Sequence, residues 1–326
     1  MNAAKPKVVV TDYSFPDLSA EEGILGAAGC ELTGRHCQGE GELIALCQDA
    51  DAVITQFAPI TGAVIGAMTR AAAIVRYGIG VDNVDLEAAR GRGIPVCNVP
   101  DYCIDEVADH TLAFILAATR QVVANTNHLR AGNWGLAVPL DAMKTLRQMT
   151  VGIVGFGRIG REVARRLAPF KCKVVAADPA VPPHEIERLG ARSATVDELL
   201  RAADLVTLHC PSTPHTRRLI NRGTLAQLKP GSILVNLGRG DLVETAALVE
   251  ALESGRLGAA ALDVFDPEPL PAEHPLRKLP NVILAPHIAS ASPTAVKKLR
   301  ETAAGLALMA VRREALPNIV NGVRPR

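Results

Sequence analysis

Three polar side chains each follow a short apolar run, and together they have the chemistry to transfer a proton and hold an acid. Arg239 lies between two glycines, Glu268 between two prolines, and His287 directly after a proline. An imidazole has a suitable pKa to accept the hydroxyl proton when a secondary alcohol is oxidised, and a carboxylate on its other ring nitrogen orients it. A guanidinium binds a carboxylate through two parallel hydrogen bonds and polarises the adjacent carbonyl. The three residues therefore predict acid–base chemistry on a small acid.

Taken alone, each of these residues also has an ordinary structural interpretation. Arg239 would be a surface turn arginine, Glu268 a solvated loop acid and His287 a helix-entry residue. The apolar runs before them have the character of strands, and open α/β sheets bind ligands at the carboxyl ends of their strands. Because all three residues follow such runs, we expect them to lie together in one site rather than to be three unrelated structural residues.

The pattern G-x-G-x-x-G begins at Gly155, directly after an apolar run and at the start of an amphipathic helical pattern. Gly155 permits a tight turn, Gly157 lets a pyrophosphate approach the backbone, and Gly160 lets helix and strand pack closely. The helix N-terminus offers amides to phosphates, and Arg158 adds a cation. Asp178, 18 residues beyond Gly160, is placed to bind ribose hydroxyls and to repel the extra phosphate of NADP. The pattern predicts an NAD site, and the alternative is a glycine-rich turn in an unrelated α/β protein.

The elements that must position these residues fall into two α/β series. In the first, short β-branched runs at 7–11, 52–55, 73–76 and 94–97 alternate with helical segments. The second has apolar runs at 151–154, 173–176, 204–208, 232–236, 259–262 and 281–284. Such alternation is typical of βαβ units with parallel sheets, so we expect two doubly wound domains.

Two longer helical patterns join these series. Residues 104–120 have acidic residues in the first turn, as the helix dipole favours, and form a helix long enough to bridge two domains. Residues 293–313 form a last helix that can return to the first domain. These two helices could connect the two series.

Length and composition set the remaining limits. A chain of 326 residues exceeds the size of one core, which stops growing at roughly 250–300 residues. The formal net charge of +1 indicates no general attraction to nucleic acid or to an anionic membrane. The seven cysteines contain no Cys-x-x-Cys pair, so neither a disulfide framework nor a metal site is predicted. Residues 1–7 contain no apolar run like that of a signal sequence, and no stretch of the sequence reaches the roughly 20 apolar residues of a membrane span. For these reasons we expect a cytoplasmic protein.

The glycine pattern, together with residues 236–240, 262–269 and 286–287, resembles the D-isomer-specific 2-hydroxyacid dehydrogenase family. The resemblance covers nearly the whole chain and looks nearest to the C-terminal-binding-protein-like branch. It implies an α/β fold in which a Rossmann NAD-binding domain, residues 103–291, is inserted into a flavodoxin-like substrate domain. The substrate domain would comprise residues 1–102 and 292–326. An NAD-dependent oxidoreductase, forming a homodimer through its cofactor domains, is what the family resemblance implies.

Matched position by position, the family's catalytic residues fall on Arg239, Glu268 and His287. By this resemblance His287 is the general acid and base, Glu268 orients it, and Arg239 binds the substrate carboxylate and carbonyl. The cofactor contacts would be Ile79, Thr111, Gly155, Gly157, Arg158, Ile159, Gly160, Asp178, Cys210, Leu237, Gly238, Arg239, Asp263, His287 and Ala289. The substrate contacts would be Gln56, Phe57, Gly78, Ile79, Gly80, Arg239 and His287, with the amides of the 79–80 pair holding the carboxylate. Cys210 fits equally well as a buried thiol at a strand end.

The residues of the predicted substrate segments disfavour some acids as the substrate but do not identify one. Phosphoglycerate dehydrogenases resemble one another in offering an arginine to the phosphate within the stretch that matches residues 55–59, and this chain has none there. The loop around Ile79 also lacks the lysine of phosphite dehydrogenases. Gln56 and Phe57 instead suggest a small polar or mixed 2-hydroxy or 2-oxo acid.

Two rival functions remain open at this point. A C-terminal-binding-protein-like module would sense NADH and dock peptides with little catalysis, and a polar or basic extension for recruiting partners would favour it. We expect no such extension, because the first strand begins at Lys7. An alanine-, glycine- or formate-type dehydrogenase is the second rival, but formate enzymes resemble the family with Gln at the position of Glu268.

Overall fold

The computed structural model describes residues 5–323 and divides the chain into two compact units. Unit 1 combines Met1–Tyr102 with Ser292–Arg326, and unit 2 is Cys103–Ala291. Most of the expectation about a signal sequence falls on residues 1–4, which lie outside the described residues. Each unit has its own sheet and core, so each is described by itself.

Unit 1 contains a parallel sheet with the strand order β2-β1-β3-β4-β5. Its strands are β1 (Lys7–Val10), β2 (Glu31–Gly34), β3 (Ala52–Thr55), β4 (Ile74–Arg76) and β5 (Val96–Cys97). Its helices are α1 (Ser19–Leu25), α2 (Glu40–Cys47), α3 (Gly62–Ala67), α4 (Leu86–Gly91) and α12 (Pro293–Val311). This is the strand order of flavodoxin-like sheets.

Successive residues of the central strands of unit 1 point to opposite faces, and each face has its own core. Val8 and Val10 pack in the cluster that contains residues of α1 and α12, whereas Val9 packs in the cluster of α2, α3 and α4. Strands buried on both faces need apolar side chains at every position, which explains the unbroken run Val8–Val10 within β1.

Unit 2 contains a parallel sheet with the order β12-β11-β10-β9-β6-β7-β8. Its strands are β6 (Thr150–Val154), β7 (Lys173–Ala177), β8 (Arg192–Ser193), β9 (Leu205–Leu208), β10 (Ser232–Asn236), β11 (Leu257–Leu262) and β12 (Val282–Leu284). Its helices are α5 (Ile104–Thr119), α6 (Val122–Arg130), α7 (Arg158–Leu167), α8 (Pro183–Glu187), α9 (Val196–Ala202), α10 (Arg222–Gln227) and α11 (Thr245–Glu253). The order reverses direction at β6, which lies between β7 and β9, and such a switch point is where doubly wound sheets bind ligands.

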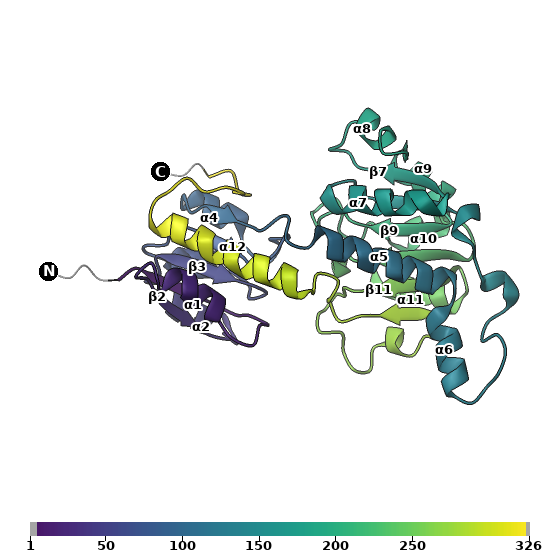
Figure 1. Cartoon of the computed structure of the whole chain (residues 1–326), viewed down its shortest axis with the longest axis horizontal. Helices are drawn as coiled ribbons and strands as arrows, with labels where there is room; N and C mark the ends of the chain where they lie inside the picture. The colour runs from purple at the N-terminus through teal and green to yellow at the C-terminus, as the bar shows by residue number, and fades with distance from the viewer. Residues whose placement is uncertain (1–4, 324–326) are drawn as a thin grey trace. The chain divides into compact units, whose positions relative to one another are not determined.

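Helices cover both faces of the sheet of unit 2. In Figure 1, α5 and α7 lie in front of the strands, and α5 contacts β10 and β11. The apolar residues of α9, α10 and α11 form the core on the other face. The α/β fold with two doubly wound parallel sheets is therefore confirmed.

The structure adds two edge strands that the apolar patterns do not predict. β2 has the sequence Glu-Leu-Thr-Gly and β8 has only two residues, Arg192 and Ser193, so neither has a β-branched run. The predicted long helix ends at Thr119 and lies wholly in unit 2, and the last helix ends at Val311 and lies in unit 1.

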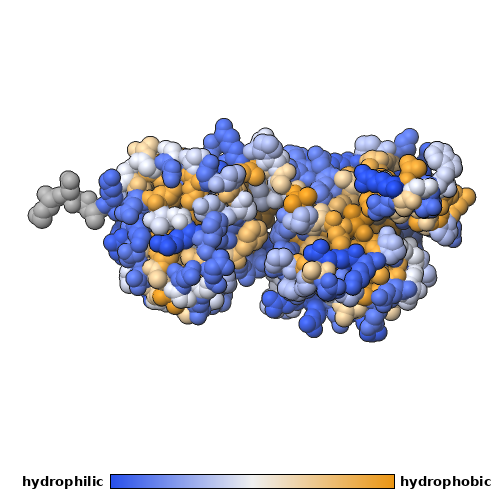
Figure 2. Space-filling model, turned by 90° about the horizontal axis from the view of Figure 1, so that it is seen from below, coloured by the Kyte–Doolittle hydropathy of each residue, from blue (hydrophilic) through white to orange (hydrophobic). Residues whose placement is uncertain are grey.

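Apolar side chains are interspersed with polar ones on the surface of both units (Figure 2). In unit 2 several large apolar side chains of α6 and the segment after it are exposed: Val122, Val123, Leu129, Trp134, Leu136 and Leu140. Trp134 has the highest exposed fraction of these, 92%. No helix in the described part of the chain is both long and apolar enough to cross a bilayer.

Candidate active site

The turn that carries Arg239 follows β10 and is held by the side chain of Asn236. The Oδ1 atom of Asn236 accepts a hydrogen bond of 3.0 Å from the amide of Gly238, and its Nδ2 donates to the carbonyl of Arg239 at 2.8 Å. Asn236 is only 1% exposed, so this side chain is fixed at the end of the strand. The Arg239 guanidinium donates to the Gly238 carbonyl at 2.8 Å.

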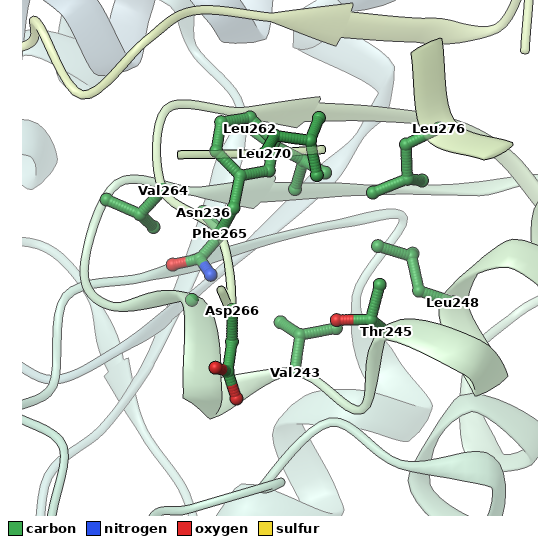
Figure 3. A pocket seen from close by; sticks show the side chains of 11 residues that line it. Asn236, Val243, Thr245, Leu248, Leu262, Val264, Phe265, Asp266, Leu270 and Leu276 are labelled. Carbon is green, nitrogen blue, oxygen red and sulfur yellow. The ribbon is translucent and has the colours of Figure 1, made fainter. Parts of the chain in front are cut away.

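Gly240 connects this turn to the loop that carries Glu268. A methyl group on Gly240 would overlap the carbonyl group of Phe265 and lie 2.6 Å from the amide nitrogen of Asp266. A mainly apolar pocket adjoins this contact, lined by Val243, Leu248, Leu262, Val264, Leu270 and Leu276 with the Asn236 and Asp266 side chains (Figure 3). The two loops thus pack backbone against backbone on an apolar base.

Glu268 and His287 form the centre of the candidate site. His287 Nδ1 lies 2.7 Å from Oε2 of Glu268, and the other carboxylate oxygen accepts a hydrogen bond of 2.8 Å from the amide of Phe265. Burial acts to raise the pKa of Glu268, but the hydrogen bond and charge of His287, the Phe265 amide and the charge of Arg239 outweigh it, so that this pKa lies below its ordinary value. Glu268 is held as an ionised acceptor.

The backbone of His287 is held by Asp263, which follows β11. The amide of His287 donates to the Asp263 carbonyl at 2.8 Å, and the Asp263 carboxylate accepts from the amides of Ile288 and Ala289 at 2.8 and 2.9 Å. His287 has a φ of 54°, a left-handed conformation that residues other than glycine adopt at a cost. Asp263 is 1% exposed, and burial raises its pKa while the two amides act to lower it. These contacts fix the imidazole at the end of β12.

The glycine pattern adopts the expected strand–turn–helix geometry. Gly155 has a φ of 92°, and a methyl group there would lie 2.5 Å from the carbonyl carbon of His209. A methyl group on Gly160 would overlap the Gly155 carbonyl, whereas one on Gly157 would meet open space. Two of the glycines therefore serve close packing, and Gly157 opens the N-terminus of α7 for an approaching ligand. Arg158 is exposed and Ile159 is half-buried beside it.

Asp178 stands directly after β7, beside this turn. Its Oδ2 accepts a hydrogen bond of 2.7 Å from the amide of Phe156, and its Oδ1 accepts one of 2.9 Å from Ala180. The half-buried carboxylate is thus oriented by backbone donors on both oxygens.

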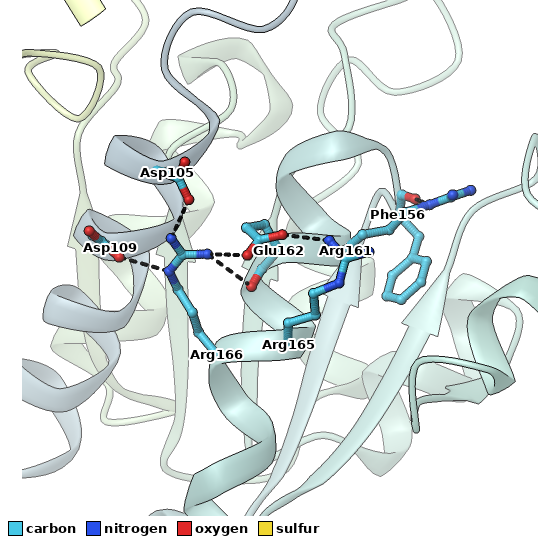
Figure 4. A network of polar contacts seen from close by, with 7 residues as sticks. All are labelled: Asp105, Asp109, Phe156, Arg161, Glu162, Arg165 and Arg166. Atoms are coloured by element: carbon cyan, nitrogen blue, oxygen red, sulfur yellow. Dashed lines mark hydrogen bonds and ion pairs between the residues drawn. The ribbon is translucent and has the colours of Figure 1, made fainter. Parts of the chain in front are cut away.

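An ion-pair network fixes the helix that begins at the glycine pattern. Arg166 of α7 reaches Asp105 and Asp109 of α5 at 2.6 and 2.7 Å, and it also pairs with Glu162 at 2.7 Å (Figure 4). The predicted cofactor residue Thr111 lies in the same helix α5, buried, with its hydroxyl donated to the Val107 carbonyl.

The remaining predicted cofactor positions of unit 2 line the strand ends. Leu237 is 8% exposed and lies in the turn beside Gly238. Burial raises the pKa of the Cys210 thiol to about 11, so this side chain is neutral at physiological pH. Its neighbour His209, to which the sequence assigns no role, has a pKa lowered to about 4 by burial and lies with Nε2 at 2.9 Å from the Thr207 hydroxyl.

The predicted substrate loop lies in unit 1, after β4. The carbonyl of Ile79 accepts a hydrogen bond of 2.6 Å from the Asn98 side chain, and the carbonyl of Gly78 accepts one of 3.0 Å from the amide of Val99. Within the described residues, neither the Ile79 nor the Gly80 amide donates a hydrogen bond. The loop is anchored through its carbonyls while two amides are available to a ligand.

Gln56 and Phe57 follow β3 in the same unit. Asp12 accepts hydrogen bonds from both of their amides, at 2.9 and 2.6 Å. The Gln56 side chain is 7% exposed and pairs with the amide and hydroxyl of Ser14 at 2.6 and 2.9 Å, whereas Phe57 is 52% exposed. Phe57 presents its ring to solvent, and Gln56 holds the loop.

The sequence argument misses Arg76, the last residue of β4. Its guanidinium carbon lies 5.8 Å from the centre of the Phe57 ring and would lie 2.6 Å from a methyl group on Gly78. The side chain is 8% exposed, so a buried cation underlies both predicted substrate segments. Residues 55–59 contain no arginine, but the end of the neighbouring strand β4 brings one beside Phe57, and the argument against a phosphorylated substrate stays a prediction. The sequence does show one sign of Arg76: it is a cation at the end of an apolar strand, directly before the glycine-rich loop.

Comparison with known proteins identifies the family. Residues 112–289 match the description "D-isomer specific 2-hydroxyacid dehydrogenase, NAD binding domain". The chain is 37% identical over 319 residues to D-3-phosphoglycerate dehydrogenase of Mycobacterium tuberculosis, covering 97% of this chain and 59% of that protein. It is 37% identical over 283 residues to glyoxylate reductase of Korarchaeum cryptofilum, covering 86% of this chain and 85% of that protein.

Solved structures of similar fold point to the same family. The TT0316 protein of Thermus thermophilus is 39% identical with a TM-score of 0.85, over 96% of this chain and 99% of that one. The chain thus spans about three fifths of the length of the mycobacterial dehydrogenase it matches and nearly all of the Thermus protein. It belongs to the D-isomer-specific 2-hydroxyacid dehydrogenase family, with an NAD-binding domain in unit 2.

Proposed function

We propose that this protein transfers a hydride between NAD(H) and a small 2-hydroxy or 2-oxo acid. The observation that carries the proposal is the hydrogen bond of 2.7 Å between His287 and Glu268, in which the carboxylate is itself held by the Phe265 amide. This pair is built for a base whose charge changes during the reaction.

In the proposed mechanism His287 is the general acid and base. In the oxidation its Nε2 takes the hydroxyl proton of the acid, and the positive charge that develops on the ring is compensated by Glu268 through Nδ1. In the reduction the same proton returns to the carbonyl oxygen. Arg239 binds the carboxylate of the acid and polarises its carbonyl, held in place by the Asn236 side chain.

The residues around α7 fit NAD. Gly157 leaves open space at the helix N-terminus, and the Asp178 carboxylate is oriented at the end of the adjacent strand. We infer that Gly155, Gly157, Arg158, Ile159 and Gly160 hold the pyrophosphate and that Asp178 binds the ribose. When bound, NAD accepts or supplies the hydride at its nicotinamide ring. Thr111, Cys210, Leu237, Gly238, Asp263, Ala289 and, from unit 1, Ile79 complete the proposed cofactor contacts.

We assign unit 2 as the cofactor domain and unit 1 as the substrate domain, with boundaries after residues 102 and 291. The available amides of Ile79 and Gly80 suit the carboxylate of the acid. Gly78 gives the loop its shape, and Gln56 and Phe57 border the side-chain region. Arg76 at this position adds the charge for an acid that carries a second anionic group.

We also propose a homodimer formed through unit 2. The exposed apolar side chains of α6 and the segment that follows, such as Leu129, Trp134 and Leu140, support it. Monomeric proteins rarely expose a contiguous apolar patch larger than a few hundred Å². Sedimentation of the purified protein tests this proposal, and a monomer at all concentrations contradicts it.

The test of the activity is NADH oxidation against a panel of 2-oxo acids: glyoxylate, hydroxypyruvate, pyruvate, oxaloacetate, phenylpyruvate and phosphohydroxypyruvate. His287→Ala is compared with His184→Ala, a control on the exposed side of α8. Turnover that is lost only in His287→Ala supports the dehydrogenase. Binding of NADH without turnover of any acid favours instead a C-terminal-binding-protein-like binding module, which the dehydrogenase and reductase names of the relatives disfavour.

The panel also tests the substrate class. Arg76→Gln is expected to raise KM for phosphohydroxypyruvate more than KM for hydroxypyruvate, because only the former carries a second anion for the guanidinium. Equal effects on both acids contradict a role of Arg76 in selecting between them.

A further inference from the structure

A buried carboxylate in unit 1, Glu21, lies outside the site described above. It belongs to α1 and is 0% exposed. Its oxygens accept a hydrogen bond of 2.8 Å from the Tyr77 hydroxyl and bonds of 3.0 and 2.7 Å from Nε and Nη2 of Arg300. A charge removed from water is tolerated only when paired and hydrogen-bonded, and Glu21 meets both conditions.

Arg300 comes from α12 and is 279 residues away from Glu21 in sequence. Its Nη2 also donates to the Asp17 carbonyl at 2.7 Å, and its guanidinium lies 5.1 Å from the centre of the Phe15 ring. The Phe15 ring meets Tyr77 edge to face at 5.3 Å. The edge-to-face contact with Phe15 and the hydrogen bond to Glu21 therefore hold the Tyr77 ring from two directions.

Tyr77 is the residue that joins β4 to the loop with the available amides. Its amide donates to the Thr55 carbonyl at 2.8 Å, its side chain is 1% exposed, and Gly78, Ile79 and Gly80 follow directly. Burial, with the Glu21 carboxylate beside the phenol, raises the pKa of Tyr77, so that the hydroxyl remains a donor.

We propose that Glu21 and Arg300 are positioning residues that act through Tyr77 to aim the Ile79 and Gly80 amides at the carboxylate of the acid. The inference rests on the proposed function, since it concerns the same loop. It makes the last helix of the chain, α12, part of acid recognition, although none of its residues contacts the acid in the proposal.

The principal variant is Tyr77→Phe, which removes the hydroxyl and keeps the ring contact with Phe15. Tyr13→Phe is the matched control, because the Tyr13 hydroxyl makes no hydrogen bond within the described residues and its ring stacks on His36. Losing one hydrogen bond to a charged acceptor corresponds to roughly a 10-fold effect. We expect KM for the acid to rise about 10-fold in Tyr77→Phe, with kcat changed less.

Amide hydrogen exchange of the peptide that contains residues 77–80 is measured in parallel on the protein without any acid. Exchange at the hydrogen-bonded amides of residues 77 and 78 is expected to accelerate in Tyr77→Phe and to match wild type in Tyr13→Phe. Glu21→Gln keeps an acceptor for the Tyr77 hydroxyl and is expected to lie between wild type and Tyr77→Phe in both readouts. Wild-type KM and wild-type exchange in Tyr77→Phe overturn the proposal.

The two readouts separate this inference from the proposed function. If wild type turns over no acid but exchange at residues 77 and 78 accelerates in Tyr77→Phe, the positioning is supported and the dehydrogenase assignment fails. If wild type is an active dehydrogenase and Tyr77→Phe raises KM only as much as Tyr13→Phe does, the dehydrogenase stands and the positioning is refuted.

Discussion

His287 and Glu268 lie on loops that leave the neighbouring strands β12 and β11, and their Nδ1 and Oε2 atoms are 2.7 Å apart. The hydrogen bond spans 19 residues of sequence. It turns Nδ1 toward the carboxylate, and the proposed mechanism uses the other ring nitrogen, Nε2, for proton exchange with the acid.

Replacing Glu268 with Gln tests this pair. The amide keeps the size of the side chain but not the charge that stabilises the protonated imidazole, so kcat is expected to fall about 100-fold with a smaller change in KM. Because the pKa of Glu268 is lowered, the carboxylate stays ionised to a lower pH than an ordinary glutamate does, and its contribution is lost as the pH falls through that lowered pKa. A steady-state pH profile measures both effects. Unchanged kcat in Glu268→Gln contradicts the assigned role.

Gly240→Ala tests the contact between the Arg239 turn and the Glu268 loop. The new methyl group overlaps backbone atoms of Phe265. Backbone atoms cannot give way by the rotation of a side chain, so the two loops must shift. We expect a loss of about 1–3 kcal/mol in the free energy of unfolding and a drop in kcat, measured by urea denaturation and by the NADH assay. Gly305→Ala in α12, where a methyl group meets no atom within 4 Å, is the control and is expected to leave both unchanged or to add stability.

Asp178→Ser tests the choice of cofactor. Serine removes the negative charge that repels a 2′-phosphate and a hydrogen-bond acceptor for the ribose, so the ratio of kcat/KM for NADH over NADPH is expected to fall about 10-fold or more. Asp197→Ser, at the first turn of α9, changes the net charge equally without touching the glycine turn. The assignment fails if both variants show the wild-type ratio.

His209 makes stability depend on pH. Its pKa is about 4 in the folded protein against 6.5 for an ordinary histidine, so between these values the unfolded chain binds the additional proton. The free energy of unfolding therefore falls as pH drops from 6.5 toward 4, by at most about 1.4 kcal/mol per pH unit, and this residue contributes nothing above pH 7.

The comparison of wild type with His209→Gln isolates that effect, because all other groups titrate in both proteins. Urea denaturation at several pH values is expected to give a shallower decline for the variant below pH 6.5. Parallel curves for the two proteins would show that His209 is protonated in the folded state as easily as in the unfolded state.

The sequence predicts most of the buried framework and misses elements at its edges. The runs around Val9 and Val53 are apolar because both faces of their strands are covered, and such runs are visible in a sequence. β2 lies at an edge, where one side needs no partner strand and polar residues are tolerated, so Glu31 and Thr33 conceal it. Edge strands have no strong pattern to detect.

The candidate site follows the same division. Arg239, Glu268 and His287 could be predicted because each stands next to an apolar strand in a recognisable pattern. The sequence shows Arg76 only as a cation at a strand end and gives no sign of Glu21, because the surroundings of both depend on distant segments: Phe57 for one, Arg300 for the other. An acid in the first turn of a short helix gives no sign in the sequence that it is fully buried.

The discontinuous make-up of unit 1 has a consequence for synthesis on the ribosome. One face of its sheet is covered by Leu299, Ala303 and Ala307 of α12, which are translated only after all of unit 2. Unit 2 is a continuous segment and can fold as soon as it emerges, whereas the N-terminal segment of unit 1 must wait with part of its core uncovered. The apolar face of the N-terminal segment therefore stays uncovered until α12 has been made, and this helix completes the domain that was begun first.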